Sequence, residues 1–166
     1  MSLWRHLVAV LFLPGVVTLA VPALIAWRTD PEVLWWPALA ALGVVLIALG
    51  LVLVVRTVAL FAAVGRGTLA PWDPTSRLVV EGPYRYVRNP MISGVLAILL
   101  GEAVLLGSLA LLMWFAAVFA ANAVYLPLVE ERGLKRRFGR EYDAYRSQVP
   151  RWIPRLRPWD REETTS

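Results

Sequence analysis

Three long stretches of this chain carry almost no charge, and they restrict its fold more than any other feature. Residues 7–27 and 33–55 contain no charged side chain, and residues 91–129 contain only Glu102. A helix needs about 20 apolar residues to cross the hydrocarbon core of a bilayer, so each stretch is long enough. Apolar residues make up 58% of the chain and charged residues only 17%, too little polar surface for a soluble protein. The sequence therefore predicts an all-α, multi-span integral membrane protein.

The third apolar stretch, residues 91–129, is too long for a single span. As one helix it would extend for ~60 Å, about twice the hydrocarbon thickness. Gly107 and Ser108 interrupt it, and we expect a tight helical hairpin there, with arms at residues 90–106 and 109–129. Together with the two N-terminal stretches, the hairpin gives about four transmembrane helices.

The polar parts of the chain are expected to surround these spans within one domain, residues 1–166. Residues 1–56 form a two-span N-terminal part, and a loop rich in Gly, Pro and Arg is expected over residues 56–90. After the hairpin, apolar side chains recur at helical spacing to about residue 148, which predicts an amphipathic C-terminal helix. Residues 159–166 are expected to be a polar tail.

The basic residues predict the orientation of the chain in the membrane. The loop at residues 56–90 and the C-terminal segment are rich in arginine, whereas the break at residues 28–32 contains one basic residue. An even number of spans places both basic regions on one side, which we expect to be cytoplasmic. The prediction is a multi-pass protein of a bacterial or archaeal inner membrane with its active site facing the cytoplasm.

Composition excludes several kinds of chemistry. The chain has no cysteine and a single histidine, His6. Disulfides, thiolate metal sites and a cysteine nucleophile are therefore excluded, and a zinc site built on several histidines is not expected. The arginines form no arrayed face with stacking aromatic residues, so no nucleic-acid partner is expected.

Two charged clusters flank the hairpin. One is the segment 81–90, immediately before the hairpin, and the other is the pair Glu130-Glu131, immediately after it. Because the hairpin folds back, these clusters should meet at one membrane face. A helix that is capped by Asn89 and begins at Pro90 offers free N–H groups that favour a carboxylate, and paired glutamates favour an ammonium group.

Tyr84 and Tyr86 would add flat surfaces for a purine or a sulfonium cation. An amino acid joined to a nucleoside has a carboxylate, an ammonium group and a purine, and so fits all three parts of this site. S-adenosylmethionine is such a ligand, although this chemistry does not single out one cofactor. Each residue also has an ordinary explanation: Arg85 and Arg88 as membrane-surface anchors, and the glutamates as a solvated helix start.

The same residues carry a resemblance to a known family. The run GPYRYVRNPM at residues 82–91, with Gly94 following, resembles the signature of the isoprenylcysteine carboxyl methyltransferase and phospholipid methyltransferase superfamily. So does the block EERGLKRRFGREYDAY at 130–145, followed by VPRWIP at 149–154. The two blocks stand in the right order around an apolar hairpin, and the match covers residues 78–155. This part is therefore expected to bind the cofactor.

The resemblance implies that S-adenosylmethionine binds near the cytoplasmic face and that a lipophilic or lipid substrate arrives from the bilayer. In such proteins the Arg-Asn-Pro segment and the paired glutamates contact the cofactor. The full set of cofactor contacts that we expect is Gly82, Tyr84, Tyr86, Arg88, Asn89, Pro90, Glu130 and Glu131.

On the substrate side we expect Arg151 and Tyr145, with Glu102 or a glutamate of the pocket as a base if the methyl acceptor is an amine. One departure from the family pattern is Asn89, where many relatives have histidine. Asparagine cannot titrate near neutral pH, so a general base is not expected at this position.

The sequence thus predicts S-adenosylmethionine-dependent methyl transfer to an isoprenylcysteine-type carboxylate, a lipid amine or a thiol. Two other classes stay open. A membrane reductase of the steroid-reductase type would share the Arg-x-Pro helix start but use NADPH. A non-enzymatic membrane scaffold would keep the fold and bind neither cofactor.

Overall fold

The structure, a computed structural model, describes residues 14–31, 36–64 and 78–160, and these ranges contain helices and no β-strand. His6 and residues 65–77 of the predicted loop lie outside the described residues. In chain order the elements are the π-helix η1 (Val16–Ala20), α2 (Val21–Thr29), α3 (Pro37–Val64), the 3₁₀-helix η2 (Gly82–Arg85), α4 (Pro90–Leu105), α5 (Leu109–Tyr125), the π-helix η3 (Leu126–Glu130) and α6 (Glu131–Gln148).

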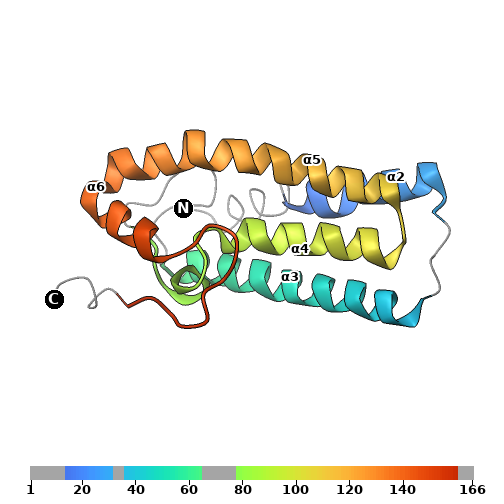
Figure 1. Cartoon of the computed structure of the whole chain (residues 1–166), viewed down its shortest axis with the longest axis horizontal. Coiled ribbons are helices and arrows are strands. Elements are labelled where there is room, and N and C mark those ends of the chain that lie inside the picture. The colour runs from blue at the N-terminus through green and yellow to red at the C-terminus, as the bar shows by residue number, and fades with distance from the viewer. Residues whose placement is uncertain (1–13, 32–35, 65–77, 161–166) are drawn as a thin grey trace.

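The predicted hairpin at Gly107 and Ser108 is confirmed. Helix α4 ends at Leu105, and α5 runs back beside it, so that α4 lies between α3 and α5 (Figure 1). The Ser108 hydroxyl caps α5 by accepting a hydrogen bond from the Leu111 N–H, at 3.3 Å. Asn89 stands at the N-cap of α4 as predicted, but its side chain makes no capping hydrogen bond.

Helices α3 and α4 are held in close backbone contact by paired glycines. A Cβ added to Gly43 would lie 2.8 Å from the carbonyl oxygen of Gly101, and one added to Gly50 would lie 2.6 Å from that of Gly94. Small residues permit this close approach. In lipid, burying apolar side chains does not drive helices together, so the van der Waals packing between the two backbones is what stabilises the contact. We call these four residues the glycine seam.

The outward faces of the helices are apolar. Side chains such as Leu49 and Val52 on α3, and Met113 and Phe119 on α5, are exposed. Within the described residues, α3 and the helix that begins at Leu109 are long and apolar enough to cross a membrane. Exposed apolar faces on such helices are suited to lipid contact.

Helix α3, which corresponds to the second predicted span, extends further than the sequence predicts. The loop expected from residue 56 begins later, because α3 continues through Arg56 to Val64. An exposed charge at one position does not end a helix when good helix formers such as Ala59 and Leu60 follow it.

The polar end of the molecule has its own hydrophobic core. This core includes Trp159, the first residue of the predicted polar tail. Tyr142, Tyr145 and Val149 form a buried cluster with Trp159, which is 4% exposed. The ring centroids of Tyr145 and Trp159 are 5.5 Å apart. The chain is therefore packed through Trp159, and the tail expected at residues 159–166 does not begin there.

Replacing Gly50 with alanine is expected to destabilise the protein, because the new Cβ would collide with the Gly94 carbonyl. Overpacking of this kind costs about 1–3 kcal/mol. The matched control is Gly133→Ala in α6, where an added Cβ meets nothing within 4 Å. Thermal unfolding in detergent compares the two variants, and equal melting temperatures would contradict a close-packed seam.

Candidate active site

The segment that leads into α4 is fixed by local hydrogen bonds. Helix η2 begins at the exposed Gly82, and the N–H groups of Tyr86 and Val87 both donate to the Pro83 carbonyl, at 3.1 and 3.2 Å. Val87 is buried, with 2% exposure. The tight turn and this buried side chain place Arg88 at the start of α4, beside the polar end of the bundle.

Residues 149–160, which we call the C-terminal strap, bind along this segment. The Arg88 N–H donates to the Pro150 carbonyl, the Arg155 N–H to the Tyr86 carbonyl, and the Trp159 N–H to the Arg85 carbonyl, at 2.9, 3.0 and 2.9 Å. Backbone groups of two segments far apart in sequence thus satisfy each other.

Side chains reinforce this connection. The Arg85 Nε donates to the Trp159 carbonyl at 2.9 Å, and its guanidinium pairs with Asp160. The Tyr145 hydroxyl donates to the Tyr84 carbonyl at 2.7 Å. Tyr145 is itself 2% exposed, so it packs within the polar end and holds Tyr84 in position, and its predicted contact with the substrate stays a prediction.

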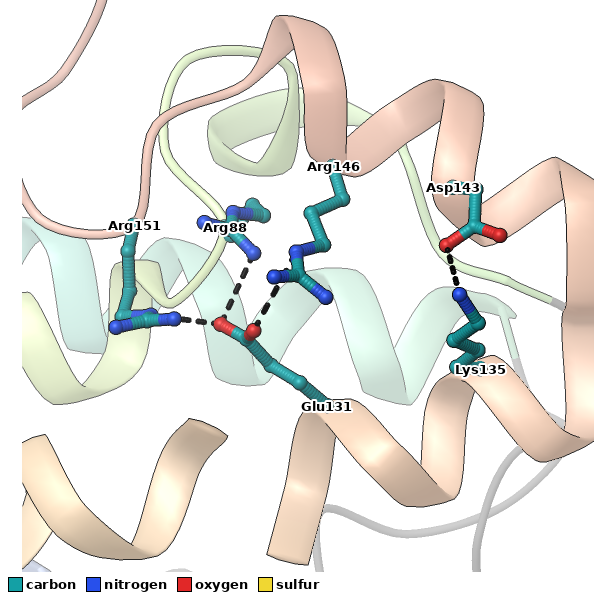
Figure 2. A network of polar contacts seen from close by, with 6 residues as sticks. All are labelled: Arg88, Glu131, Lys135, Asp143, Arg146 and Arg151. Carbon is teal, nitrogen blue, oxygen red and sulfur yellow. Dashed lines mark hydrogen bonds and ion pairs between the residues drawn. The ribbon is translucent and has the colours of Figure 1, made fainter. Parts of the chain in front are cut away.

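At the centre of the site, arginines from three segments converge on one carboxylate, as Figure 2 shows. The Oε1 atom of Glu131 accepts from Arg88 Nη1 at 2.9 Å and from Arg151 Nε at 2.6 Å. Its Oε2 atom lies 3.7 Å from Arg146 Nε. We call these residues the Glu131 cluster. The hydrogen bond to Glu131 raises the pKa of Arg151, so this arginine remains charged.

A backbone bend in α6 brings Arg146 to the cluster. In a straight helix Glu131 and Arg146 would be ~22 Å apart. Gly139 has φ 52° and ψ −122°, a conformation that L side chains rarely adopt, and the helix turns back there (Figure 1). The same bend brings Lys135 within 3.2 Å of Asp143. The predicted single amphipathic helix is therefore two helical segments joined by a kink.

The Glu131 cluster holds more positive than negative charge. Its three guanidinium groups face one carboxylate whose side chain is 5% exposed. Arg88 Nε is buried and finds no acceptor among the described residues. An anionic group would satisfy both the charge excess and this donor. Among the described residues no group of three or more His, Cys, Asp or Glu is placed to hold a metal ion.

Tyr84 and Glu130 lie close to one another beside the cluster. Burial and the Glu130 carboxylate both raise the pKa of the Tyr84 phenol, which therefore stays protonated. Tyr84 comes from η2, which precedes the hairpin in the sequence, and Glu130 comes from the end of η3, which follows it.

The structure thus brings together most of the predicted cofactor residues at one end of the hairpin. Asn89 and Pro90 are buried beside Arg88, while Tyr86 is 38% exposed. Glu102 is not part of this group, because it lies twelve residues along α4 from Pro90, a distance of ~18 Å. A base at Glu102 is therefore out of reach of the Glu131 cluster.

Sequence reasoning missed Arg146 and the packing of Trp159. The signal for the first is Gly139, a glycine within an otherwise continuous helical pattern. Trp159 has no signal in its own neighbourhood, since the residues that cover it, such as Tyr145 and Arg85, are distant in sequence.

Comparison with known proteins agrees with this geometry. The phospholipid methyltransferase family model matches residues 38–141, which is more than half of the chain. The chain therefore belongs to the phospholipid methyltransferase family, and the resemblance seen in the sequence is confirmed.

Among curated proteins, the chain is 38% identical over 82 residues to protein-S-isoprenylcysteine O-methyltransferase B of Arabidopsis thaliana, covering 47% of this chain and 40% of the relative. It is 36% identical over 77 residues to protein-S-isoprenylcysteine O-methyltransferase of Schizosaccharomyces pombe, covering 46% of this chain and 33% of the relative. The matches thus span less than half the length of either relative.

The fold resembles that of a solved structure, the eukaryotic intramembrane Ras methyltransferase isoprenylcysteine carboxyl methyltransferase. The TM-score is 0.59, with 22% identity over 89% of this chain and 53% of that one. At this identity the likeness concerns the fold. Family and fold together identify the chain as an integral membrane protein.

Replacing Glu131 with glutamine is expected to destabilise the protein by about 3 kcal/mol, because the arginines around it would lose their counter-charge in a largely buried position. Asp143→Asn is the matched control, since its ion pair with Lys135 is exposed and contributes little. Thermal unfolding measures both, and a harmless Glu131→Gln change would contradict a structural role for the cluster.

Proposed function

We propose that this protein is an S-adenosylmethionine-dependent methyltransferase that acts on the carboxylate of a lipophilic, isoprenylcysteine-type substrate. The observation that carries the proposal is the convergence of Arg88 and Arg151 on Glu131. This contact joins the two sequence blocks on which the resemblance rests into one charged site at the end of the hairpin. Membership of the phospholipid methyltransferase family and relatives that methylate isoprenylcysteine support the same reaction class.

The residues present fit the proposed cofactor. The carboxylate of its amino-acid part suits the unpaired Nε of Arg88 and the positive excess of the cluster. Glu130 suits its ammonium group, and Tyr84 offers an aromatic surface for its adenine ring. When bound, the cofactor supplies an electrophilic methyl group on a positively charged sulfur.

The protein itself then has to align the cofactor with the methyl acceptor and to exclude water from them. Alignment of two bound reactants supplies several kcal/mol of the barrier reduction. A carboxylate acceptor is already a nucleophile and needs no base, which agrees with Asn89 in place of histidine and with the distance of Glu102. An arginine-rich site also favours a carboxylate over a protonated amine. Arg151, at the edge of the cluster, is our candidate for orienting the acceptor.

In this proposal the site lies at the cytoplasmic face of a multi-pass protein with about four spans. The helix from Pro37 to Leu60 and the helix that begins at Leu109 are long enough to cross on their own. The shorter helices α2 and α4 pack against them and would complete the set. The excess of arginine at the end of the bundle that holds the Glu131 cluster supports the cytoplasmic orientation.

The test is transfer of a labelled methyl group from S-adenosylmethionine by the purified protein in nanodiscs. An S-prenylated cysteine with a free carboxylate is expected to be methylated, while the same compound with its carboxylate amidated is not. A phosphatidylethanolamine acceptor tests the lipid-amine alternative. Binding of NADPH without S-adenosylmethionine would instead support the reductase class, and binding of neither the scaffold class.

Arg88→Gln is expected to weaken binding of S-adenosylmethionine about tenfold to a hundredfold, the value of a charge-assisted hydrogen bond. Arg136→Gln in α6 removes the same charge from an exposed position outside the cluster and is expected to bind normally. Equilibrium binding of labelled cofactor compares the two variants, and equal affinities would remove Arg88 from the cofactor site.

A further inference from the structure

The C-terminal strap carries apolar side chains that nothing in the described part of the chain covers. Leu156 is 99% exposed and Ile153 is 78% exposed, the largest exposed fractions among the large apolar residues that the structure describes. Both lie outside the helices, in a segment that follows the polar α6. Exposed apolar side chains in such a place indicate a surface that is buried against something else.

Basic residues alternate with these apolar side chains. Arg155 and Arg157 flank Leu156, and Arg157 is exposed. Arg155 is partly exposed. Apolar side chains interleaved with arginines match the boundary of a bilayer, where acyl chains and anionic phosphates lie within a few ångströms of each other.

The strap is held in place rather than free. Its backbone is bonded to η2 at Arg155 and Trp159, as described above. The Trp152 ring packs on the ring of Phe119 in α5, with centroids 5.4 Å apart. Leu156 and Ile153 are therefore presented from a fixed segment.

The contact with Phe119 shows where the strap lies relative to the apolar helix. Phe119 precedes Glu130 by eleven residues, which is ~16 Å along the helix. The Trp152 ring therefore lies beside the apolar part of α5, while Arg151, the residue before it, contacts Glu131 in the charged site. At this point the strap adjoins both the charged site and the apolar helix.

We propose that residues 152–157 form an interfacial anchor, in which Ile153 and Leu156 enter the bilayer boundary and Arg155 and Arg157 bind anionic lipid headgroups. The occupant is a lipid surface, because residues 152–157 adjoin the apolar helix α5 through Trp152 and their two charged side chains, Arg155 and Arg157, are both positive. The anchor does not depend on the proposed methyl transfer.

The absence of cysteine from the sequence makes a direct test possible, because a single introduced cysteine can be labelled without background. Leu156→Cys carries an environment-sensitive fluorophore on the strap, and Ser147→Cys carries it on the exposed polar surface of α6. Both proteins are reconstituted in vesicles of phosphatidylcholine, with or without phosphatidylglycerol, that contain lipids spin-labelled near the headgroup.

Lipid quenching is expected to be several-fold stronger for the label at position 156 than for the label at 147, and to increase with phosphatidylglycerol. In the Arg155→Gln/Arg157→Gln background the increase should be lost, since each arginine contributes about fivefold to affinity for an anionic surface. Equal quenching at the two positions would overturn the proposal. So would a label at 156 that is shielded from water but not quenched by lipid, which would indicate a protein partner.

Discussion

The polar end of this protein depends on one buried carboxylate. Glu131 accepts from Arg88 at the start of α4 and from Arg151 in the strap, and it also faces Arg146 near the end of α6. Arg88 precedes Glu131 by 43 residues, and Arg151 follows it by 20. Without them the carboxylate, whose side chain is 5% exposed, would be a buried charge with no partner, and without it the arginines would repel one another. The geometry of the site is thus set by the ion pairs between Glu131 and its arginines, in addition to apolar packing.

The helices supply the frame within which these charges meet. The hairpin returns the chain to the level at which α4 begins, and the π-turn η3 carries the helix past Pro127 without a break. The kink at Gly139 then sends the second half of α6 back toward Glu131. Strap and η2 are joined by backbone hydrogen bonds. Together these features bring residues 88, 131, 146 and 151 within contact distance.

Much of this arrangement could be predicted from the sequence. The hairpin follows from the length of the apolar stretch and from Gly107-Ser108, and the meeting of Arg88 with Glu131 follows from the hairpin. The kink was not predicted, because the apolar spacing of Leu134, Phe138 and later residues continues through Gly139 as in one straight helix. Trp159 was mistaken for part of a tail, since its burial depends on tertiary partners that composition does not reveal.

The glycine seam has a consequence for how a ligand from the bilayer could enter. Where the backbones of α3 and α4 touch, between Gly43 and Gly101 and between Gly50 and Gly94, no side passage is left, and one could form only by prising the two helices apart. A ligand that entered sideways along α4 would therefore be expected on the flank toward α5. Of the two long helices that pack on α4 in the described part of the chain, α3 is closed against it at the glycine seam, and α5 is not joined to it in this way.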